Sequence, residues 1–416
     1  MVNGRFVVHN ISQLVTNEGA GWEPLRGAAQ SRLRVVKGAA IVIDNGRISS
    51  VIDEESVGRY EGEKIDARQR VVMPGFVDPH THVVFAGTRE EEFYMKLKGK
   101  TYLELLQSGN GINRTVRETR AASEEEIYRQ SLQRVQDAVR CGTTTLEIKT
   151  GYGLDLESEM KMLRVMDRIA SLGIVNVVKT FLGMHAVPPG MTEDSYTAEV
   201  MGRMLERFSE RVDFVDAFCD RGAFSPQSTD LFFAASSRKG LKMRLHADEI
   251  EDIGCLDLCL KYRLHSVDHL LETGDAGLKK ILQGGSVATL LPITGFSLDR
   301  IRFPDARKFI DAGIPVAIGT DCSPVSYNIS MPFAIYLAVR FCGMTVEEAI
   351  NAATVNAAYS LDVLGRKATI EPGKDADILI LNVDDYRKIP YQYSSSLVDS
   401  VFVMGEPIMR HGYFSL

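Results

Sequence analysis

Short apolar runs alternate with segments of helical periodicity through the middle of the chain. Eight such runs lie between residues 71 and 318, and segments such as 157–170 and 199–210 separate them with apolar residues at the spacing of one helix face. Eight buried strands alternating with helices predict an α/β fold of the (β/α)8 barrel type, although an open doubly wound sheet also fits. The runs are 71–78, 143–148, 175–182, 212–218, 242–246, 264–268, 286–291 and 314–318.

The two ends of the chain have a different, β-rich pattern. A run at 39–43 meets an Asp-Asn-Gly turn at 44–46 and returns at 47–52, which predicts a hairpin. Similar runs reappear after about residue 365, at 376–381 and 400–404. We therefore predict one small β-sandwich domain built from residues 1–70 and 366–416, beside a catalytic barrel of residues 71–365.

Composition narrows the class of protein. The chain has 416 residues, of which 45% are apolar and 25% charged, as in globular proteins. A formal charge of −7 leaves no basic field for a nucleic-acid backbone. No apolar run approaches the length that spans a bilayer, and residues 1–10 carry no secretion signal. We expect a cytoplasmic protein with neither a nucleic-acid nor a membrane partner.

The cysteines support the same interpretation. Six are scattered along the chain without a pair of C-x-x-C motifs, so neither a zinc knuckle nor a disulfide framework is expected. Cys255 and Cys259 lie one helical turn apart, and two small buried side chains explain them better than a metal clip. This pattern is typical of a reducing cytoplasm.

Histidines gather where the predicted strands end. Five of the eight histidines lie at or just after the downstream end of a strand, and carboxylates occupy two more strand ends. In a barrel these ends converge on the catalytic face. One such histidine is usually a satisfied polar residue, but five with two carboxylates are hard to explain as packing. The five are His80, His82, His185, His246 and His269.

Four of these strand-end residues form a plausible metal site. His80 and His82 are two residues apart in an extended segment, so their rings point the same way. His246 ends another strand and Asp321 follows the last one. Three imidazoles and a carboxylate suit Zn²⁺ or Fe²⁺, and such an ion lowers the pKa of a bound water from ~15.7 toward ~7.

Two further residues can transfer protons beside that water. Glu249 lies three residues after His246, and His269 ends the next strand. A carboxylate that only starts a helix is a serious alternative for Glu249. With Asp321, these two residues make up the predicted catalytic set.

Several motifs carry a family resemblance. Pro-Gly-Phe-Val-Asp-Pro-His-Thr-His at 74–82 resembles the opening motif of the amidohydrolase superfamily, and 371–377 resembles its return to the small β domain. Within the superfamily the chain is most similar to imidazolonepropionase. Matching motifs occur in the same order and at similar spacings, at 86–93, 149–154, 183–186 and 246–249.

The resemblance implies a reaction and residue roles. It implies hydrolysis of 4-imidazolone-5-propanoate to N-formimidoyl-L-glutamate in histidine degradation, by a homodimer that uses one divalent metal ion, Zn²⁺ or Fe. His269 would help to activate water, and Glu249 would approach the substrate ring. The implied metal ligands are His80, His82, His246 and Asp321. The implied substrate contacts are Arg89, Tyr102, Tyr152, His185, Glu249, Ser323, Val325 and Ser326.

Physical reasoning supports Arg89 independently, because a guanidinium fork binds a carboxylate such as a propionate at two points. The alternative is a surface arginine paired with the glutamates at 90–92, a run that we interpret mostly as a solvated helix start. Tyr152 lies between two glycines. That suits a loop packed close to a ligand, although a plain turn would also use them.

Two local features qualify the resemblance. After Asp321 the family usually has Asn and Gly around a proline, whereas this chain has Ser323 and Val325. The shape of that loop is therefore an open point. Many superfamily members also use a carbamylated lysine on the fourth strand to bridge two ions. The fourth run, 212–218, contains no lysine, which favours a single ion.

Two other functions compete with this interpretation. A deaminase of the same superfamily, acting on a nucleobase-like ring, would have a nearly identical metal site. Arg89 and His185 argue against it, because a free nucleobase has no carboxylate to anchor. A non-catalytic relative that kept the barrel and lost the metal is the second alternative. The presence of four ligands and two proton-transfer candidates argues against that one.

Overall fold

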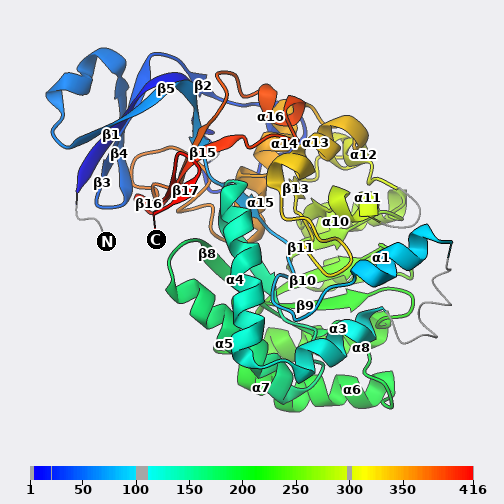
Figure 1. Cartoon of the computed structure of the whole chain (residues 1–416). Helices are drawn as coiled ribbons and strands as arrows, with labels where there is room; N and C mark the ends of the chain where they lie inside the picture. Colours follow the sequence, from blue (N-terminus) through cyan, green and yellow to red (C-terminus); the bar gives the residue numbers. More distant parts are fainter. Residues whose placement is uncertain (1–3, 20, 100–110, 298–301, 416) are drawn as a thin grey trace.

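The computed structural model describes residues 4–19, 21–99, 111–297 and 302–415. The described part contains an eight-stranded parallel sheet and a separate nine-stranded sheet (Figure 1). Strands of the first sheet are joined through helices, whereas most strands of the second pair with antiparallel neighbours. The structure confirms the α/β class and the two-part architecture.

The eight-stranded sheet runs in chain order from β6 to β13. Its first and last strands are joined just beyond their ends, where the Asp321 amide donates to the His80 carbonyl at 3.0 Å and the His82 amide donates to the Cys322 carbonyl at 2.9 Å. These bonds close the barrel and exclude the open doubly wound sheet. The strands are β6 Phe76–Asp78, β7 Thr143–Lys149, β8 Asn176–Met184, β9 Phe214–Cys219, β10 Lys242–Ala247, β11 Leu264–His269, β12 Val287–Leu290 and β13 Val316–Ile318.

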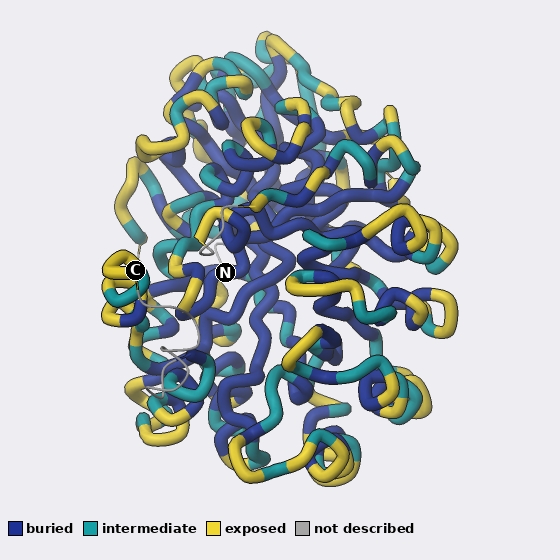
Figure 2. The backbone as a smooth tube through the Cα atoms, turned by 90° about the vertical axis from the view of Figure 1, so that its right-hand side faces the viewer, coloured by how far each residue is buried: buried dark blue, intermediate teal, exposed yellow. Residues whose placement is uncertain are grey.

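Helices surround this barrel, with exposed residues on their outer faces and buried strands at the centre (Figure 2). Their starts follow ordinary capping chemistry: the Ser123 hydroxyl, for example, accepts a hydrogen bond from the Glu126 amide at the start of α4. The helices are α1 Glu90–Leu97, α3 Ile112–Ala121, α4 Glu124–Arg140, α5 Leu156–Ser171, α6 Glu193–Glu199, α7 Leu205–Phe208, α8 Pro226–Arg238, α9 Leu258–Lys261, α10 Asp275–Gly284, α11 Pro292–Ser297, α12 Ala306–Asp311, α13 Met331–Phe341, α14 Val346–Ala352, α15 Val355–Ser360 and α16 Lys388–Tyr391. Short 3-10 turns occupy Gly27–Ser31, Glu54–Arg59 and Cys255–Asp257, and a π turn occupies Val200–Met204.

The nine-stranded sheet combines strands from both ends of the chain. Its order is β17-β16-β15-β14-β5-β1-β3-β4, with β2 paired to β1. Phe6 of β1 stacks on Phe402 of β15 at 5.6 Å although two strands separate them, so the sheet curls around an apolar core into a sandwich. The strands are β1 Arg5–Val15, β2 Val35–Val36, β3 Ala39–Asp44, β4 Arg47–Asp53, β5 Glu63–Pro74, β14 Ile378–Leu381, β15 Val398–Val403, β16 Glu406–Arg410 and β17 Tyr413–Phe414.

The predicted hairpin is confirmed, since β3 and β4 pair antiparallel across the Asp-Asn-Gly turn. The predicted first barrel strand is divided instead. Residues up to Pro74 continue β5, where Met73 pairs with Leu379, and only Phe76–Asp78 enters the barrel. The apolar pattern of this run does not show that its first part belongs to the nine-stranded sheet and its second part to the barrel. The domain bounds at 70 and 365 remain a prediction.

The cysteines depart from expectation. Cys219, at the end of β9, and Cys255 form a disulfide with their Cα atoms 5.9 Å apart. They are 36 residues apart in sequence, so no local spacing indicated the pairing. Cys259 is buried and free, as the sequence indicated.

No helix in the described ranges is long and apolar enough to cross a membrane.

Candidate metal centre

Three predicted ligands meet at one end of the barrel. His80 and His82 follow β6, and His246 lies near the end of β10. Ring nitrogens of all three lie within 4.8 Å of one another, and all three side chains are buried. The convergence follows from the parallel strands, whose carboxyl ends share one face of the barrel.

The fourth predicted ligand, Asp321, joins this cluster from beyond β13. Its Oδ1 lies 3.6 Å from His80 Nε2 and 3.4 Å from His82 Nε2. The Thr294 hydroxyl donates to Oδ2 at 2.5 Å and orients the carboxyl group. Burial raises the pKa of Asp321 to about 6, against the opposing effect of Thr294. A cation beside it would favour the charged form.

The hydrogen bonds of the ligands fit a divalent ion. His80 Nδ1 donates to Asp268 at 2.7 Å, and His246 Nδ1 lies 3.1 Å from Asp216. These bonds leave the Nε2 atoms of His80 and His246 buried without a hydrogen-bond partner in the described residues. Unpaired buried polar atoms are costly, and carboxylate–histidine pairs of this kind are typical of metal sites. Burial, and next the charge of Lys149, hold the pKa of His80 well below its ordinary value, which keeps the ring neutral as a ligand.

Glu249 and His269 lie together beside the cluster. The Glu249 carboxyl group is 3.6 Å from His269 Nδ1, and the His269 and His246 ring centroids are 5.2 Å apart. Burial, followed by the charge of Asp321, raises the pKa of Glu249 to about 8. Burial also holds the pKa of His269 well below its ordinary value. At neutral pH the pair therefore consists of a protonated acid and a neutral base.

His185 and Tyr152 form an aromatic wall on another side of the cluster. The His185 ring stacks on His82 with centroids 5.1 Å apart, and Tyr152 lies 5.1 Å from His185. His185 Nδ1 donates to the Gly151 carbonyl at 2.9 Å. A Cβ at Gly151 would lie 2.8 Å from that nitrogen, and its φ of +114° favours glycine. The close approach of the His185 ring, rather than a plain turn, explains why glycine occupies this position.

Arg89 is not a surface residue. Its side chain is only 9% exposed, and its Nε and Nη2 donate to Glu92 at 2.9 and 2.7 Å. Glu92 also accepts from the Gly111 amide at 3.0 Å, so it is buried rather than part of a solvated helix start. Burial raises the pKa of Tyr152, and the Arg89 charge acts in the opposite direction.

The loop after Asp321 has its own geometry. The Ser323 amide donates to the Ser326 carbonyl at 3.1 Å, and the Ser326 amide returns a bond to the Ser323 hydroxyl at 3.2 Å. Both serines are buried, whereas Val325 is 40% exposed and has no positive φ. The backbone at this position therefore does not require glycine. Tyr102 lies outside the described residues.

Comparisons with known proteins decide the family. The chain is 43% identical over 403 residues to the imidazolonepropionase of Picrophilus torridus, with 97% of this chain and 98% of the relative covered. It is 44% identical over 398 residues to that of Thermoplasma volcanium, with 96% of each chain covered. The chain belongs to the imidazolonepropionase family. A model described as "Amidohydrolase family" also matches residues 278–408.

Solved structures agree with this family at the level of the fold. An adenosine deaminase from Xanthomonas campestris with bound zinc superposes with a TM-score of 0.75 at 14% identity, covering 98% of this chain and 94% of that one. Guanine deaminase from E. coli gives a TM-score of 0.75 at 15% identity, covering 98% and 99%. At such low identity, the likeness of these neighbours to the imidazolonepropionase-family chain shows the fold alone.

Sequence reasoning missed the residues that hold the site of this imidazolonepropionase-family chain in place. Asp216 and Asp268 orient two histidines, and the Asp220 carboxylate accepts the Glu249 amide at 2.8 Å. A signal existed for Asp216 and Asp268. Alternate residues of a strand face the same side, and each of these two aspartates lies at a strand position that faces the inside of the barrel.

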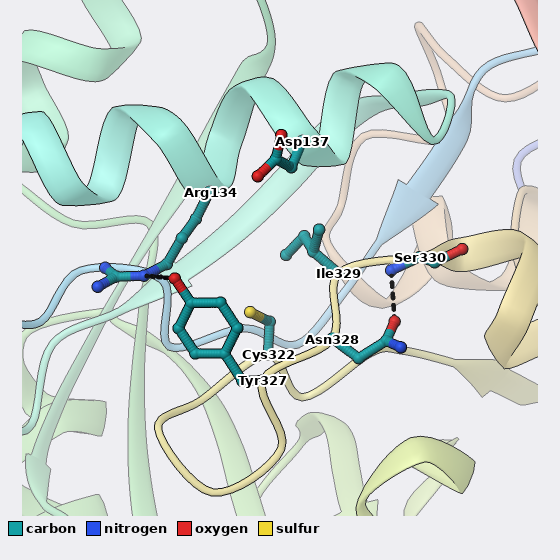
Figure 3. A pocket seen from close by; sticks show the side chains of 7 residues that line it. All are labelled: Arg134, Asp137, Cys322, Tyr327, Asn328, Ile329 and Ser330. Atoms are coloured by element: carbon teal, nitrogen blue, oxygen red, sulfur yellow. Dashed lines mark hydrogen bonds between the residues drawn. The ribbon is translucent and has the colours of Figure 1, made fainter. Parts of the chain in front are cut away.

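A cavity of about 260 Å³ elsewhere contains none of the predicted ligands or substrate contacts. In Figure 3, Arg134 reaches from α4 to the Tyr327 hydroxyl, 3.2 Å away, along one side of it. The other lining residues are Asp137, Cys322, Asn328, Ile329 and Ser330.

Proposed function

We propose that this site hydrolyses the ring amide of 4-imidazolone-5-propanoate to N-formimidoyl-L-glutamate, using one divalent metal ion, Zn²⁺ or Fe²⁺. Water adds to the ring carbonyl carbon, the adjacent carbon–nitrogen bond breaks, and the leaving nitrogen gains a proton. The observation that carries this proposal is the convergence of three buried histidines, Asp321 and a Glu249–His269 pair in a member of this family.

His80, His82, His246 and Asp321 would hold the ion. When bound there, a divalent ion polarises the carbonyl and lowers the pKa of a coordinated water toward ~7. All four side chains are buried, and burial holds the pKa values of His80 and His82 well below their ordinary value. Hydrogen bonds to Asp268, Asp216 and Thr294 fix His80, His246 and Asp321, respectively. The fold therefore prepares the ligands before the ion arrives.

Glu249 and His269 move the protons. His269 is neutral because burial lowers its pKa, so it can accept a proton from water. Glu249 is protonated at neutral pH because its pKa is about 8, so it can protonate the leaving nitrogen. Their separation of 3.6 Å allows the proton to pass from one to the other.

Arg89 anchors the propionate. Among the described residues, Glu92 accepts from the Nε and Nη2 atoms, and Nη1 with the remaining Nη2 proton would serve the substrate carboxylate. Tyr152 and His185 lie beside His82, and they would contact the substrate next to the metal ligands. Anchoring the side chain orients the ring toward the attacking water, which lowers the barrier. Tyr102, Ser323, Val325 and Ser326 are the other proposed contacts.

A direct assay tests the function. Purified protein loaded with Zn²⁺ or Fe²⁺ should consume 4-imidazolone-5-propanoate and release N-formimidoyl-L-glutamate, and a chelator should abolish turnover until metal is restored. Guanine, adenosine and cytosine serve as the comparison panel. Ammonia release from a nucleobase without imidazolonepropanoate turnover would instead establish a deaminase, and protein without a stoichiometric ion would indicate a scaffold. The homodimer and the cytoplasmic location remain predictions.

A further inference from the structure

A group of charged side chains fills the barrel beneath the metal histidines. All are fully buried, and they come from four neighbouring or facing strands. Buried charges are costly unless they are paired and hydrogen-bonded, so their arrangement requires an explanation. The group consists of Glu147 and Lys149 on β7, Asp216 on β9, Arg244 on β10 and Asp268 on β11.

The Lys149 ammonium lies at the centre of this group. Its Nζ is 2.7 Å from Glu147 Oε1, 2.7 Å from Asp216 Oδ2 and 3.9 Å from Asp268 Oδ2. Arg244 adds a second cation, with Nη2 3.2 Å from Asp268 Oδ2. Lys149 therefore contacts Asp216 directly, and both cations lie near Asp268 Oδ2.

Those same aspartates hold the metal histidines. Asp216 lies 3.1 Å from His246 Nδ1, and Asp268 accepts from His80 Nδ1 at 2.7 Å. Two continuous chains of contacts result, each running from a buried cation through a carboxylate to an imidazole. In both chains the imidazole ends at an Nε2 that has no hydrogen-bond partner among the described residues.

We propose that Lys149 is a positioning residue for the metal centre. Its ammonium fixes Asp216 directly and, together with Arg244, fixes Asp268, so that His246 and His80 present Nε2 to the ion. Outer partners of metal histidines set ring orientation and ligand basicity, and changing them weakens metal binding by ~10–100-fold. The inference rests on the proposed function only in requiring that an ion binds at these histidines.

Lys149 also bears on the number of ions. Asp216, His246 and Asp268 form a second cluster whose donor atoms lie within 4.8 Å of one another. The Lys149 ammonium already contacts Asp216 and approaches Asp268. It therefore supplies the positive charge that a second metal ion would otherwise bring to this cluster. One ion at the histidines and one ammonium below them is the arrangement that the carboxylates favour.

A purely structural ion pair is the alternative, and the chain contains a matched example. Lys367 is 3% exposed and lies 2.7 Å from Asp377 and 3.2 Å from Asp375. Like Lys149, it is a buried lysine between two carboxylates. No histidine contacts either of those carboxylates among the described residues. Lys367→Met therefore controls for the loss of a buried ion pair.

The test compares Lys149→Met with Lys367→Met, using Co²⁺ as the probe in the full-length protein. Chelator competition gives the Kd for Co²⁺, the visible spectrum reports ligand geometry, and thermal unfolding reports stability. We expect both variants to lose stability, but only Lys149→Met to bind Co²⁺ ~10–100-fold more weakly with an altered spectrum. A folded Lys149→Met protein with unchanged Kd and spectrum overturns the proposal.

A second pair of variants covers the case in which Lys149→Met does not fold. Asp216→Asn and Asp268→Asn keep the size of each side chain while removing the charge that Lys149 and Arg244 hold. We expect each to weaken Co²⁺ binding about tenfold or more. Unchanged Co²⁺ binding in both would overturn the proposal. No substrate is used, so wild-type protein that binds Co²⁺ but does not hydrolyse imidazolonepropanoate would refute the proposed function and leave the Lys149 inference intact.

Discussion

The two interiors of this molecule are built on opposite principles. Between the layers of the nine-stranded sheet, side chains such as Phe6, Ile41 and Phe402 make an apolar core. Inside the barrel, below the histidines, Lys149 and its carboxylate partners occupy the equivalent fully buried space. Apolar packing stabilises a fold wherever it occurs, whereas buried ion pairs contribute little net stability. The barrel therefore has the less stabilising interior of the two, and its buried charges orient the proposed metal ligands.

The largest contrast should come from removing one side chain from each interior. His246→Ala deletes a proposed ligand. We expect metal affinity to fall by more than the ~10–100-fold that follows from changing an outer partner of a ligand. Turnover should be lost and the fold retained. Phe402→Ala should cost ~3–5 kcal/mol of stability while leaving metal content unchanged. Elemental analysis and thermal unfolding measure both. Two ions per wild-type chain would contradict the single-ion site.

The next contrast separates proton transfer from metal binding within the barrel. Glu249→Gln and His269→Asn keep the ligand set but remove a group that accepts or donates a proton. Each should lower kcat by ~10²–10⁴-fold with one ion still bound. Steady-state kinetics on metal-loaded variants test this. Near-normal turnover in both variants would show that other groups move the protons.

A smaller effect is expected at Arg89, where only substrate orientation should suffer. Arg89→Ala removes a charge-assisted bond worth ~1.5–3 kcal/mol, so kcat/KM should fall by roughly 10–100-fold with metal content unchanged. Arg89→Lys keeps the charge without the fork and should remain impaired. The decisive comparison is the propionate substrate against its neutral amide analogue. If Arg89→Ala still prefers the acid, Arg89 does not anchor the carboxylate.

The smallest effect concerns pH. The pKa of Glu249 is raised to about 8, so its proton is present at neutral pH and is lost above it. We expect kcat/KM to fall about tenfold per pH unit above ~8 if Glu249 is the acid. The raised pKa also means that this group stabilises the fold at low pH, and that the contribution disappears as pH rises from about 4.5 to about 8. A pH–rate profile with an unchanged alkaline limb in Glu249→Gln would assign that limb to another group.

The strands and the convergence of the candidate ligands could be predicted from the sequence because both obey simple rules. Apolar runs mark buried strands, and parallel strands bring their carboxyl ends together, which is why the sequence alone is enough to group His80, His246 and Asp321. The supporting cations, Lys149 and Arg244, could not be predicted in the same way, because lysine and arginine are rarely buried. Lys149 begins one of the family motifs, but only the closed barrel places its ammonium between Glu147 and Asp216.

Other departures have equally local causes. The glutamate run at 90–92 predicts a solvated helix start, yet the fold turns Glu92 toward Arg89 and the Gly111 amide. Cys219 and Cys255 are distant in sequence and meet only because β9 ends beside the loop that follows β10. In both cases long-range contacts, rather than local pattern, decide the environment of a side chain.

The hydrogen bonds that close the barrel have a consequence for biogenesis. Asp321 donates its backbone amide to His80, so the seam between the first and last strands passes directly through the ligand set. A nascent chain still on the ribosome cannot offer all four ligands until Asp321 has been synthesised and β13 has docked. The complete set of four candidate ligands therefore requires a closed barrel, and truncated products lacking the last strand would lack it.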